Sequence, residues 1–326
     1  MSNHQALVVP VNLEPHPNAD SLSIVKVGGF TVVVRTDEWY GTDRGVYIEP
    51  DTLVDTKIPE FIFLNGHECI KVRKFRGIIS QGLLIHAPDG SVIGEDMWER
   101  YGLSHYEPET AMSMSGDQAP APENIHVPVY DVENLLKYNH LIFEGEPVYV
   151  TSKIHGSSWR AVYWRDELHV GSRNTWKKYD PNNMYWRVIE KYPSIREFLT
   201  LHKSKVLYGE VYGPKVQSLN YNIPSGNIEF AAFDLYSIEY NSYFLRSIAV
   251  ALTAEYKIPW VYSYGDMTFN MEKLKEIAEQ DDPIAGMNGV KQIQEGVVIS
   301  PIIERFSPEI GRVKLKLISN RYYSAK

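Results

Sequence analysis

A lysine followed three residues later by glycine occurs at Lys26, Lys74 and Lys153, so the pattern alone carries no weight. The surroundings of Lys153 are different. It ends an apolar run, PVYVTSK, that predicts a strand, and Gly156 lets the backbone approach a ligand closely. A lysine amine in this setting is a candidate nucleophile.

Five further segments with chemically useful side chains follow Lys153 in order. They are Ser172-Arg173-Asn174, YGEVYG around Glu210, FAAFDLY around Phe233, EGVVIS from Glu295, and VKLKL with Lys314 and Lys316. Together with KIHG, this series resembles the six collinear motifs of the covalent nucleotidyltransferases, the ligases and capping enzymes. The KIHG form is similar to that of ATP-dependent RNA ligases. The resemblance covers about half of the chain.

Elementary chemistry independently favours these roles. A nucleophilic lysine must be neutral, and at its ordinary pKa of about 10.4 only about one molecule in a thousand is neutral near pH 7.4. Burial and neighbouring cations lower a lysine pKa. Lys314 and Lys316 alternate on a predicted strand, and we expect them to supply those cations and to hold a phosphate. Glu295 offers the oxygen ligand that Mg²⁺ prefers.

The resemblance implies a reaction in which Lys153 attacks the α-phosphate of ATP and forms a lysyl-AMP. The AMP then passes to an RNA 5′-phosphate, and a 3′-hydroxyl displaces it and seals the strand, expected at nicks in a duplex. Mg²⁺ or Mn²⁺ is the implied metal, with Glu295 and Glu210 as its ligands. The implied nucleotide-binding residues are Ser152, His155, Gly156, Arg173, Glu210, Phe233, Lys314 and Lys316.

These residues also have ordinary structural explanations. Taken alone, a phenylalanine in a strand belongs to the core, and alternating lysines mark a solvated strand face. The sequence also departs from the family pattern, because Ser152 stands where many ligases have a glutamate. Ten residues follow Lys316, which is too short for the additional domain that ligases carry after this point. We therefore expect that module at the front of the chain.

The elements that must position these residues are predicted to form an α+β fold in two domains. A segment rich in Pro, Glu, Ser and Ala, residues 106–126, predicts a linker between a domain at 1–105 and a nucleotidyltransferase domain at 127–326. The second domain resembles an ATP-grasp-like ligase domain of antiparallel sheets with flanking helices. Its strands are predicted at 147–153, 157–165, 168–173, 206–212, 228–237, 295–300 and 312–318, and its helices at 182–203, 245–256 and 271–281.

Residues 1–105 read as short strands between turns, with no amphipathic helix longer than two turns, and predict a small barrel or sandwich. EPHPNADSL, from Glu14, resembles the opening of the tRNA-binding OB modules of some synthetases. An OB-like β-barrel followed by a nucleotidyltransferase domain resembles family-5 RNA ligases. A plain structural turn would equally explain the prolines, Asn18 and Asp20.

Clusters of positive charge predict contacts with nucleic acid. OB folds bind single strands through a basic groove with stacking aromatics, and the segment around Phe75 is strongly basic. Residues 153–178 carry a local charge of +4, and residues 311–321 are basic without any acid. The predicted nucleic-acid contacts are Lys71, Arg73, Lys74, Arg76, Lys177 and Arg312. The expected partner is RNA or an RNA-containing duplex, and the sequence indicates no protein partner.

Composition limits the alternatives. A net charge of −8 argues against a protein that coats nucleic acid by bulk positive charge. Cys69 is the only cysteine, which excludes an internal disulfide or a CxxC metal site. The sequence shows neither a signal peptide nor a membrane-spanning run, so we expect a cytoplasmic protein. Two other hypotheses stay open: a GTP-dependent, capping-type guanylyltransferase, and a non-catalytic RNA-binding protein.

Overall fold

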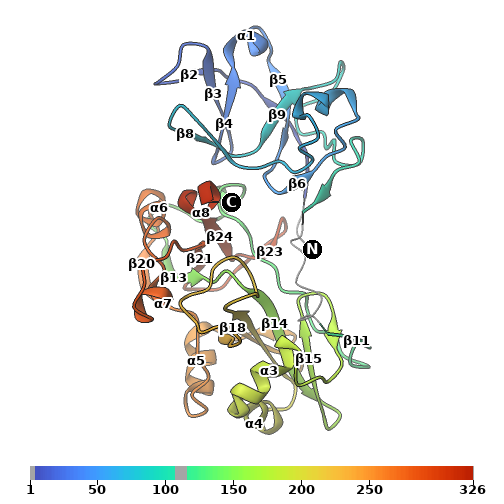
Figure 1. Cartoon of the computed structure of the whole chain (residues 1–326), viewed down its shortest axis with the longest axis vertical. Helices are drawn as coiled ribbons and strands as arrows, with labels where there is room; N and C mark the ends of the chain where they lie inside the picture. Colours follow the sequence, from blue (N-terminus) through green and yellow to red (C-terminus); the bar gives the residue numbers. More distant parts are fainter. Residues whose placement is uncertain (1–3, 107–115, 326) are drawn as a thin grey trace. The chain divides into compact units, whose positions relative to one another are not determined.

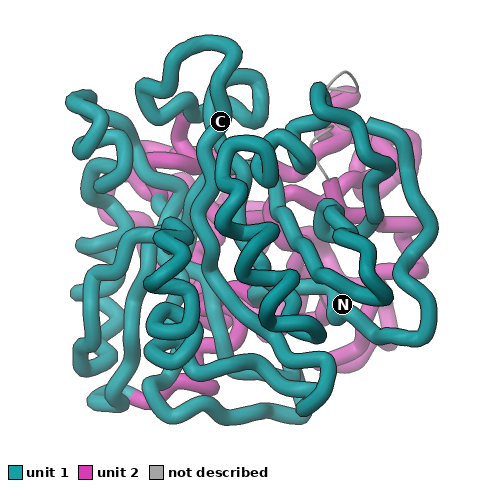
Figure 2. The backbone as a smooth tube through the Cα atoms, turned by 90° about the horizontal axis from the view of Figure 1, so that it is seen from below, with its two compact units in different colours: residues 1, 109–132, 144–319 teal, residues 2–108, 133–143, 320–326 magenta. Residues whose placement is uncertain are grey.

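The computed structural model describes residues 4–106 and 116–325, and these divide into two compact units (Figures 1 and 2). Unit 2 contains residues 4–106, 133–143 and 320–325, and unit 1 contains residues 116–132 and 144–319. These boundaries differ from the predicted ones, because residues 133–143 return to the N-terminal unit. There the Gly29 N–H donates to Leu136 O at 2.8 Å, and Lys137 pairs with Glu49 at 2.7 Å.

The predicted linker falls partly outside the described residues, at 107–115. Immediately after this stretch, the short strand β11 (Gln118–Ala119) pairs with β16 (Trp176–Lys177) in unit 1. Ile125 and Val127 pack against buried residues of the same unit. The later part of the segment is therefore built into a sheet and its core.

Unit 2 consists of short strands, arranged in separate ladders. Their orders are β1-β5-β9, β2-β3-β4, β10-β6 and β7-β8, and among the described residues they do not join into one closed barrel. The bounds are β1 (Val8–Pro10), β2 (Glu14–Pro15), β3 (Leu22–Val27), β4 (Phe30–Arg35), β5 (Arg44–Ile48), β6 (Thr52–Leu53), β7 (Arg73–Phe75), β8 (Ile78–Ser80), β9 (Leu83–His86), β10 (Ser104–His105) and β12 (Glu133–Asn134).

The helices of unit 2 are short: α1 (Thr36–Trp39), α8 (Asn320–Ala325) and the 3₁₀ turns η1 (Pro59–Leu64) and η2 (Asn139–Leu141). In its described residues the N-terminal part thus has no helix longer than two turns, as the sequence predicts. Its core contains Val8, Ile48 and Phe61, none more than 1% exposed. Strand β5, with four consecutive buried residues, and the 3₁₀ turn η1 both contribute to this core.

Unit 1 contains two antiparallel sheets. The larger has the order β11-β16-β15-β14-β17-β18-β19, and the smaller includes β24-β21-β13-β20. The remaining strands are β13 (Pro147–Lys153), β14 (Ser157–Trp164), β15 (Glu167–Ser172), β17 (Lys205–Tyr212), β18 (Glu229–Ser237), β19 (Ser242–Tyr243), β20 (Ser263–Thr268), β21 (Gly296–Pro301), β22 (Phe306–Ser307), β23 (Gly311–Arg312) and β24 (Leu315–Ile318).

The helices of unit 1 are α3 (Met184–Lys191), α4 (Pro193–Leu201), α5 (Arg246–Ala254), α6 (Met271–Ala278) and α7 (Pro283–Met287). A single helix predicted at 182–203 is in fact two, since Pro193 cannot continue the backbone hydrogen bonds of α3 and begins α4. Trp159, Phe198 and Phe230 form part of a core shared by α3, α4, α5 and the larger sheet. No described helix is long and apolar enough to span a membrane.

Candidate active site

Lys153 lies where the chain leaves one sheet of unit 1 and enters the other. It is the last residue of β13, and β14 begins four residues later in the larger sheet. An added Cβ at Gly156 would lie 2.3 Å from Val211 O and 2.8 Å from Glu210 Cγ, closer than real contacts allow. Gly156 therefore permits residues 154–156, which connect β13 to β14 and are called the connector below, to pass directly against β17.

Strand register places two carboxylates beside Lys153. Lys153 pairs with Gly296 across β13 and β21, which brings in Glu295, and Ser158 pairs with Glu210 across β14 and β17. The Lys153 Nζ donates to Glu295 Oε1 at 2.8 Å, and His155 Nδ1 lies 3.5 Å from Glu295 Oε2. Lys153, His155, Glu210 and Glu295 are called the Lys153 cluster below.

Connector contacts hold His155 in place. Its backbone N–H donates to Tyr221 Oη at 2.6 Å, and its Nε2 lies 3.0 Å from Ser218 Oγ. The ring is thus fixed between Ser218 and Glu295. Nothing in the sequence pattern singles out Ser218 or Tyr221, because their role depends on a loop that folds back onto the connector.

The Lys153 cluster contains one lysine and two carboxylates, and these groups shift one another's pKa values. Burial alone would lower the pKa of Lys153, but the charges of Glu295 and Glu210 outweigh it and raise this pKa above its ordinary value. Burial also opposes the charge of Glu295, yet Lys153 and His155 together lower its pKa to about 2. Burial raises the pKa of Glu210 to about 8, even though Lys153 acts in the opposite direction.

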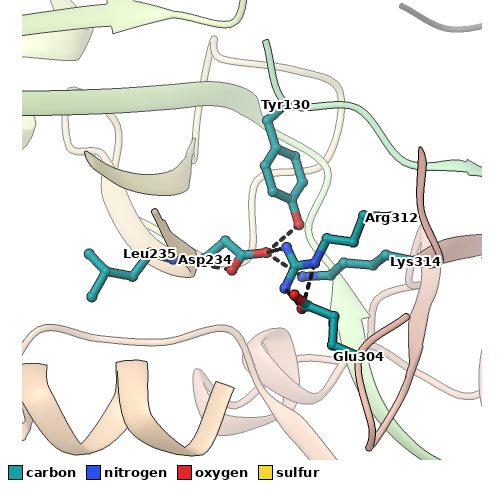
Figure 3. Close-up of polar contacts among 6 residues, drawn as sticks. All are labelled: Tyr130, Asp234, Leu235, Glu304, Arg312 and Lys314. Atoms are coloured by element: carbon teal, nitrogen blue, oxygen red, sulfur yellow. Dashed lines mark hydrogen bonds and ion pairs between the residues drawn. The ribbon is translucent and has the colours of Figure 1, made fainter. Parts of the chain in front are cut away.

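The expectation that Lys314 lowers the pKa of Lys153 is wrong for this state of the protein. Lys314 Nζ donates to Asp234 Oδ2 at 2.8 Å instead. The same oxygen accepts from Tyr130 Oη at 2.7 Å and from Arg312 Nη1 at 2.5 Å (Figure 3). Arg312 also donates to Glu304 Oε1 at 2.7 Å from its Nε. Tyr130, Asp234, Glu304, Arg312 and Lys314 are called the Asp234 cluster below.

Asp234 is a buried carboxylate that needs cationic partners. Burial would raise its pKa, but Lys314 and Arg312 lower it below its ordinary value. The predicted RNA contact of Arg312 does not fit this position, since its guanidinium is bound to Asp234 and Glu304 and its side chain is 12% exposed. A carboxylate directly after Phe233 within an apolar strand is the sequence signal that could have revealed the cluster.

The other predicted nucleotide-binding residues lie around these clusters. Ser152 is buried with no hydrogen-bond partner for its hydroxyl among the described residues, and strand alternation points it away from Lys153. Arg173 donates to Asp131 Oδ2 at 2.8 Å. The half-buried Phe233 ring lies 4.7 Å from the Tyr130 ring, and Lys316 is half-buried on β24, opposite Val298.

The predicted contacts in unit 2 are exposed on one hairpin. Lys71, Arg73, Lys74 and Arg76 all reach solvent around β7. The EPHPNADSL segment supports this hairpin, since the His16 ring lies 3.2 Å from Phe75 O and Asn18 Nδ2 donates to Arg76 O at 2.9 Å. A groove of about 900 Å³ in the same unit is lined by Arg73, Phe75 and Trp39, among others.

Two carboxylates of this site, Glu210 and Glu295, could hold a metal ion together. No group of three or more His, Cys, Asp or Glu side chains suited to a metal occurs in the part of the chain that the structure describes. Glu210 and Glu295 would need water and substrate phosphate as further ligands, which is how Mg²⁺ usually binds. The raised pKa of Glu210 fits a cation, because its negative charge lacks sufficient compensation.

Comparisons with known proteins found a matching family for each of the two units. The family described as RNA ligase matches residues 146–318, and an OB-fold domain family matches residues 8–87. No curated protein matches the sequence. Solved structures of a Naegleria gruberi RNA ligase share the fold. One with ATP and Mn has a TM-score of 0.84 at 22% identity, covering 99% of each chain.

Two more structures described as Naegleria gruberi RNA ligase give similar scores. A variant without ligand has a TM-score of 0.85 at 23% identity, covering 100% of this chain and 99% of the other. A variant with AMP and Mn has a TM-score of 0.84 at 23% identity, covering 99% and 98%. These likenesses extend over the whole chain and establish the mixed α+β fold, including its OB-fold part.

Proposed function

We propose, from the premise that this chain belongs to the RNA ligase family, that it is an ATP-dependent enzyme that seals RNA ends through Lys153. The observation that carries this proposal is the position of the Lys153 amine, 2.8 Å from Glu295 at the junction of the two sheets. An amine fixed at the end of a strand, beside carboxylates that suit a metal, is an arrangement for attack on a nucleotide phosphate.

In the first step the Lys153 nitrogen attacks the α-phosphorus of ATP. A phosphorus–nitrogen bond forms, the bond to the bridging oxygen of pyrophosphate breaks, and pyrophosphate leaves with that electron pair. Lys153 must give up its ammonium protons to solvent in this step, because the paired ammonium has no free electron pair. Its ion pair with Glu295 must therefore loosen when the nucleotide binds.

Mg²⁺ or Mn²⁺ would be held by Glu210 and Glu295 and would supply a positive charge close to the phosphates. Glu210 would lose its proton as it takes this role, since its pKa of about 8 keeps it largely protonated at neutral pH. Glu295 would exchange the Lys153 ammonium for the cation. The positive charge of the cation and the loss of the Glu295 ion pair would both favour a neutral amine at the moment of attack.

In the remaining steps an RNA 5′-phosphate oxygen takes the AMP and releases Lys153. A 3′-hydroxyl then attacks the adenylylated 5′-phosphate and AMP leaves, which completes a phosphodiester. We assign RNA contacts to Lys71, Arg73, Lys74 and Arg76, which are exposed on the β7 hairpin. A nick in a duplex is the proposed substrate, and the cytoplasm, predicted from the sequence, is the proposed location.

Covalent labelling tests this proposal. The full chain is incubated with α-labelled ATP or GTP and Mg²⁺ or Mn²⁺, and protein-bound label is measured after denaturation. We expect label from ATP, and its loss on the order of a thousandfold or more in Lys153→Ala. The matched control is Lys26→Ala, at a lysine of another K-x-x-G segment whose Nζ donates to Thr31 Oγ1 at 2.8 Å.

The other hypotheses predict different results in the same assay. Label from GTP alone would support a capping-type guanylyltransferase, and no label from either nucleotide would support a non-catalytic RNA-binding protein. Comparison of a nicked duplex with unpaired strands in the sealing reaction then tests the preference for nicks. Equal rates on both substrates would refute that preference.

A further inference from the structure

A second pocket, of about 480 Å³, lies in unit 1 at an edge of the larger sheet. β15 begins at Glu167 and continues beyond the end of its pairing with the short strand β16, which leaves part of its edge open. Figure 1 shows β15, β11 and α3 in this region of the unit. The pocket is lined by Ala119, Glu167, Leu168, His169, Val170, Trp176, Lys177, Lys178, Tyr179, Trp186 and Arg196, none of which belongs to the Lys153 or Asp234 clusters.

The largely buried side chain of Lys177 lines this pocket. Lys177 is 8% exposed, and its ammonium makes no ion pair among the described residues. Its nearest compensation is the face of the Tyr185 ring, 5.4 Å from Nζ. Burial lowers the pKa of this amine. The Lys177 amine thus presents a positive charge to the pocket with no carboxylate of the described residues to neutralise it, and such a charge suits a phosphate from outside the chain.

The rest of the lining extends this positive charge. Lys178 and Arg196 are exposed, and neither forms an ion pair within the described part of the chain. Glu167 is the one acidic residue in the lining, so the pocket carries a formal charge of +2. The whole chain has a charge of −8. Positive charge is therefore concentrated here against the overall balance.

An exposed aromatic ring stands beside the cations. Tyr179 is 61% exposed, and its ring meets Trp186 edge-on at a centroid distance of 5.1 Å and an angle of 83°. The Trp186 indole N–H is itself fixed by a bond to Lys177 O at 3.1 Å. The tyrosine ring thus packs edge-on against a positioned indole and keeps open surface for a ligand. Flat rings next to cations are how proteins bind unpaired nucleotides.

We propose that this pocket binds one nucleotide of an unpaired RNA segment, with its base against Tyr179 and its phosphate at Lys177. The proposal rests on RNA being the substrate of the enzyme and adds a contact separate from the reacting ends. A pocket of this volume falls within the range of about 300–1,000 Å³ that suits a small ligand group.

Photo-crosslinking of the full chain tests the site without any catalytic step. The probe is a nicked RNA duplex with a single-stranded extension that carries 4-thiouridine, mixed with protein in the absence of ATP and metal. We expect a crosslink to the peptide that contains Tyr179. Tyr179→Ala and Lys177→Met should each weaken binding about tenfold, because one removes a stacking surface and the other a charged contact.

Lys273→Met is the matched control, since Lys273 is exposed on α6 and makes no ion pair among the described residues. It should bind like the unchanged protein. Thermal unfolding checks that Lys177→Met is folded, and we expect little loss of stability because methionine keeps most of the apolar part of the lysine side chain. Tyr179 is exposed, so its replacement provides a second variant that does not depend on the core.

Crosslinks confined to unit 2, or equal binding by Lys177→Met and the unchanged protein, would overturn this inference and leave the proposed ligase function intact. Failure of ATP labelling with the crosslink preserved would instead refute the proposed function alone. Displacement of RNA by an equal concentration of polyglutamate would assign the pocket to acidic peptides and so overturn the assignment to RNA.

Discussion

Two charged clusters in unit 1 are built on opposite plans. In the Asp234 cluster, two cations face two carboxylates, and Lys314 and Arg312 lower the pKa of Asp234 against the effect of burial. In the Lys153 cluster, a single lysine faces two carboxylates, and burial raises the pKa of Glu210 to about 8. In the first cluster the charges compensate one another, whereas in the second Glu210 lacks a cation of its own and keeps its proton at neutral pH.

The two clusters should therefore respond differently when a charged ligand binds. A balanced cluster fixes its strands, here holding β18 near the residues that precede β24. An unbalanced cluster responds to what binds, because each added charge changes the protonation of its neighbours. Substitutions in the two clusters should therefore affect different properties.

The largest effect is expected when the balanced cluster loses its acceptor. Asp234→Ala leaves Lys314 and Arg312 buried without their shared partner, which should reduce the free energy of unfolding by about 3–5 kcal/mol. Urea denaturation followed by tryptophan fluorescence measures this change. Asp266→Ala, at an exposed aspartate on β20, is the control. A reduction below about 1 kcal/mol would contradict the structural role of the cluster.

The next effect concerns the rate of lysyl-AMP formation. Because the carboxylates raise the pKa of Lys153, the fraction of neutral amine rises about tenfold per pH unit below that pKa. At low ATP concentration the labelling rate should therefore rise about a hundredfold from pH 6 to pH 8. Rates are measured over the first turnover. A rate independent of pH in this range would show that loss of the amine proton does not limit the step.

A smaller effect is expected on stability at Glu210. Its pKa is above the ordinary 4.5 in the folded protein, so the folded state binds the proton more tightly and stability falls as the pH rises from about 4.5 to 8. Between pH 5 and pH 6.5, Glu210→Gln should remove about 2 kcal/mol of this fall. Unfolding at several pH values measures it, with Glu276→Gln on α6 as the control. An unchanged pH profile would refute the raised pKa.

The smallest effect belongs to an exposed charge that forms part of neither cluster. Lys74→Ala, on the β7 hairpin, should leave stability within about 0.5 kcal/mol and reduce the slope of log binding constant against log salt by about 1. RNA binding at several salt concentrations measures the slope. The same change in slope for Lys26→Ala, on β3, would deny the hairpin a specific part in RNA binding.

The residue pattern of the sequence predicts most of the strands around Lys153. β13, predicted at 147–153, has those bounds, and β17, β18 and β21 begin within a residue of their predicted starts. Residue type and alternation are enough for this. The proximity of Lys153 to Glu295 follows from strand register, which the sequence does not contain.

The partner of Lys314 could not be derived in the same way. The sequence shows two alternating lysines but not which face of the strand each one takes, nor that Asp234 lies opposite one of them. The proposed barrel likewise depends on closure between ladders, and short strands in sequence do not specify closure. The roles of the site residues in binding nucleotide and RNA stay predictions for the experiments above.

Unit 2 is assembled from three stretches of chain that are far apart in the sequence. The ribosome therefore synthesises its parts at different times. Synthesis produces its first hundred residues early, but Leu135, fully buried, and Tyr322, 4% exposed, arrive much later. Domains otherwise tend to fold as they emerge from the ribosome. Unit 2 therefore gains its last packed side chains only after all the strands of unit 1 have been synthesised.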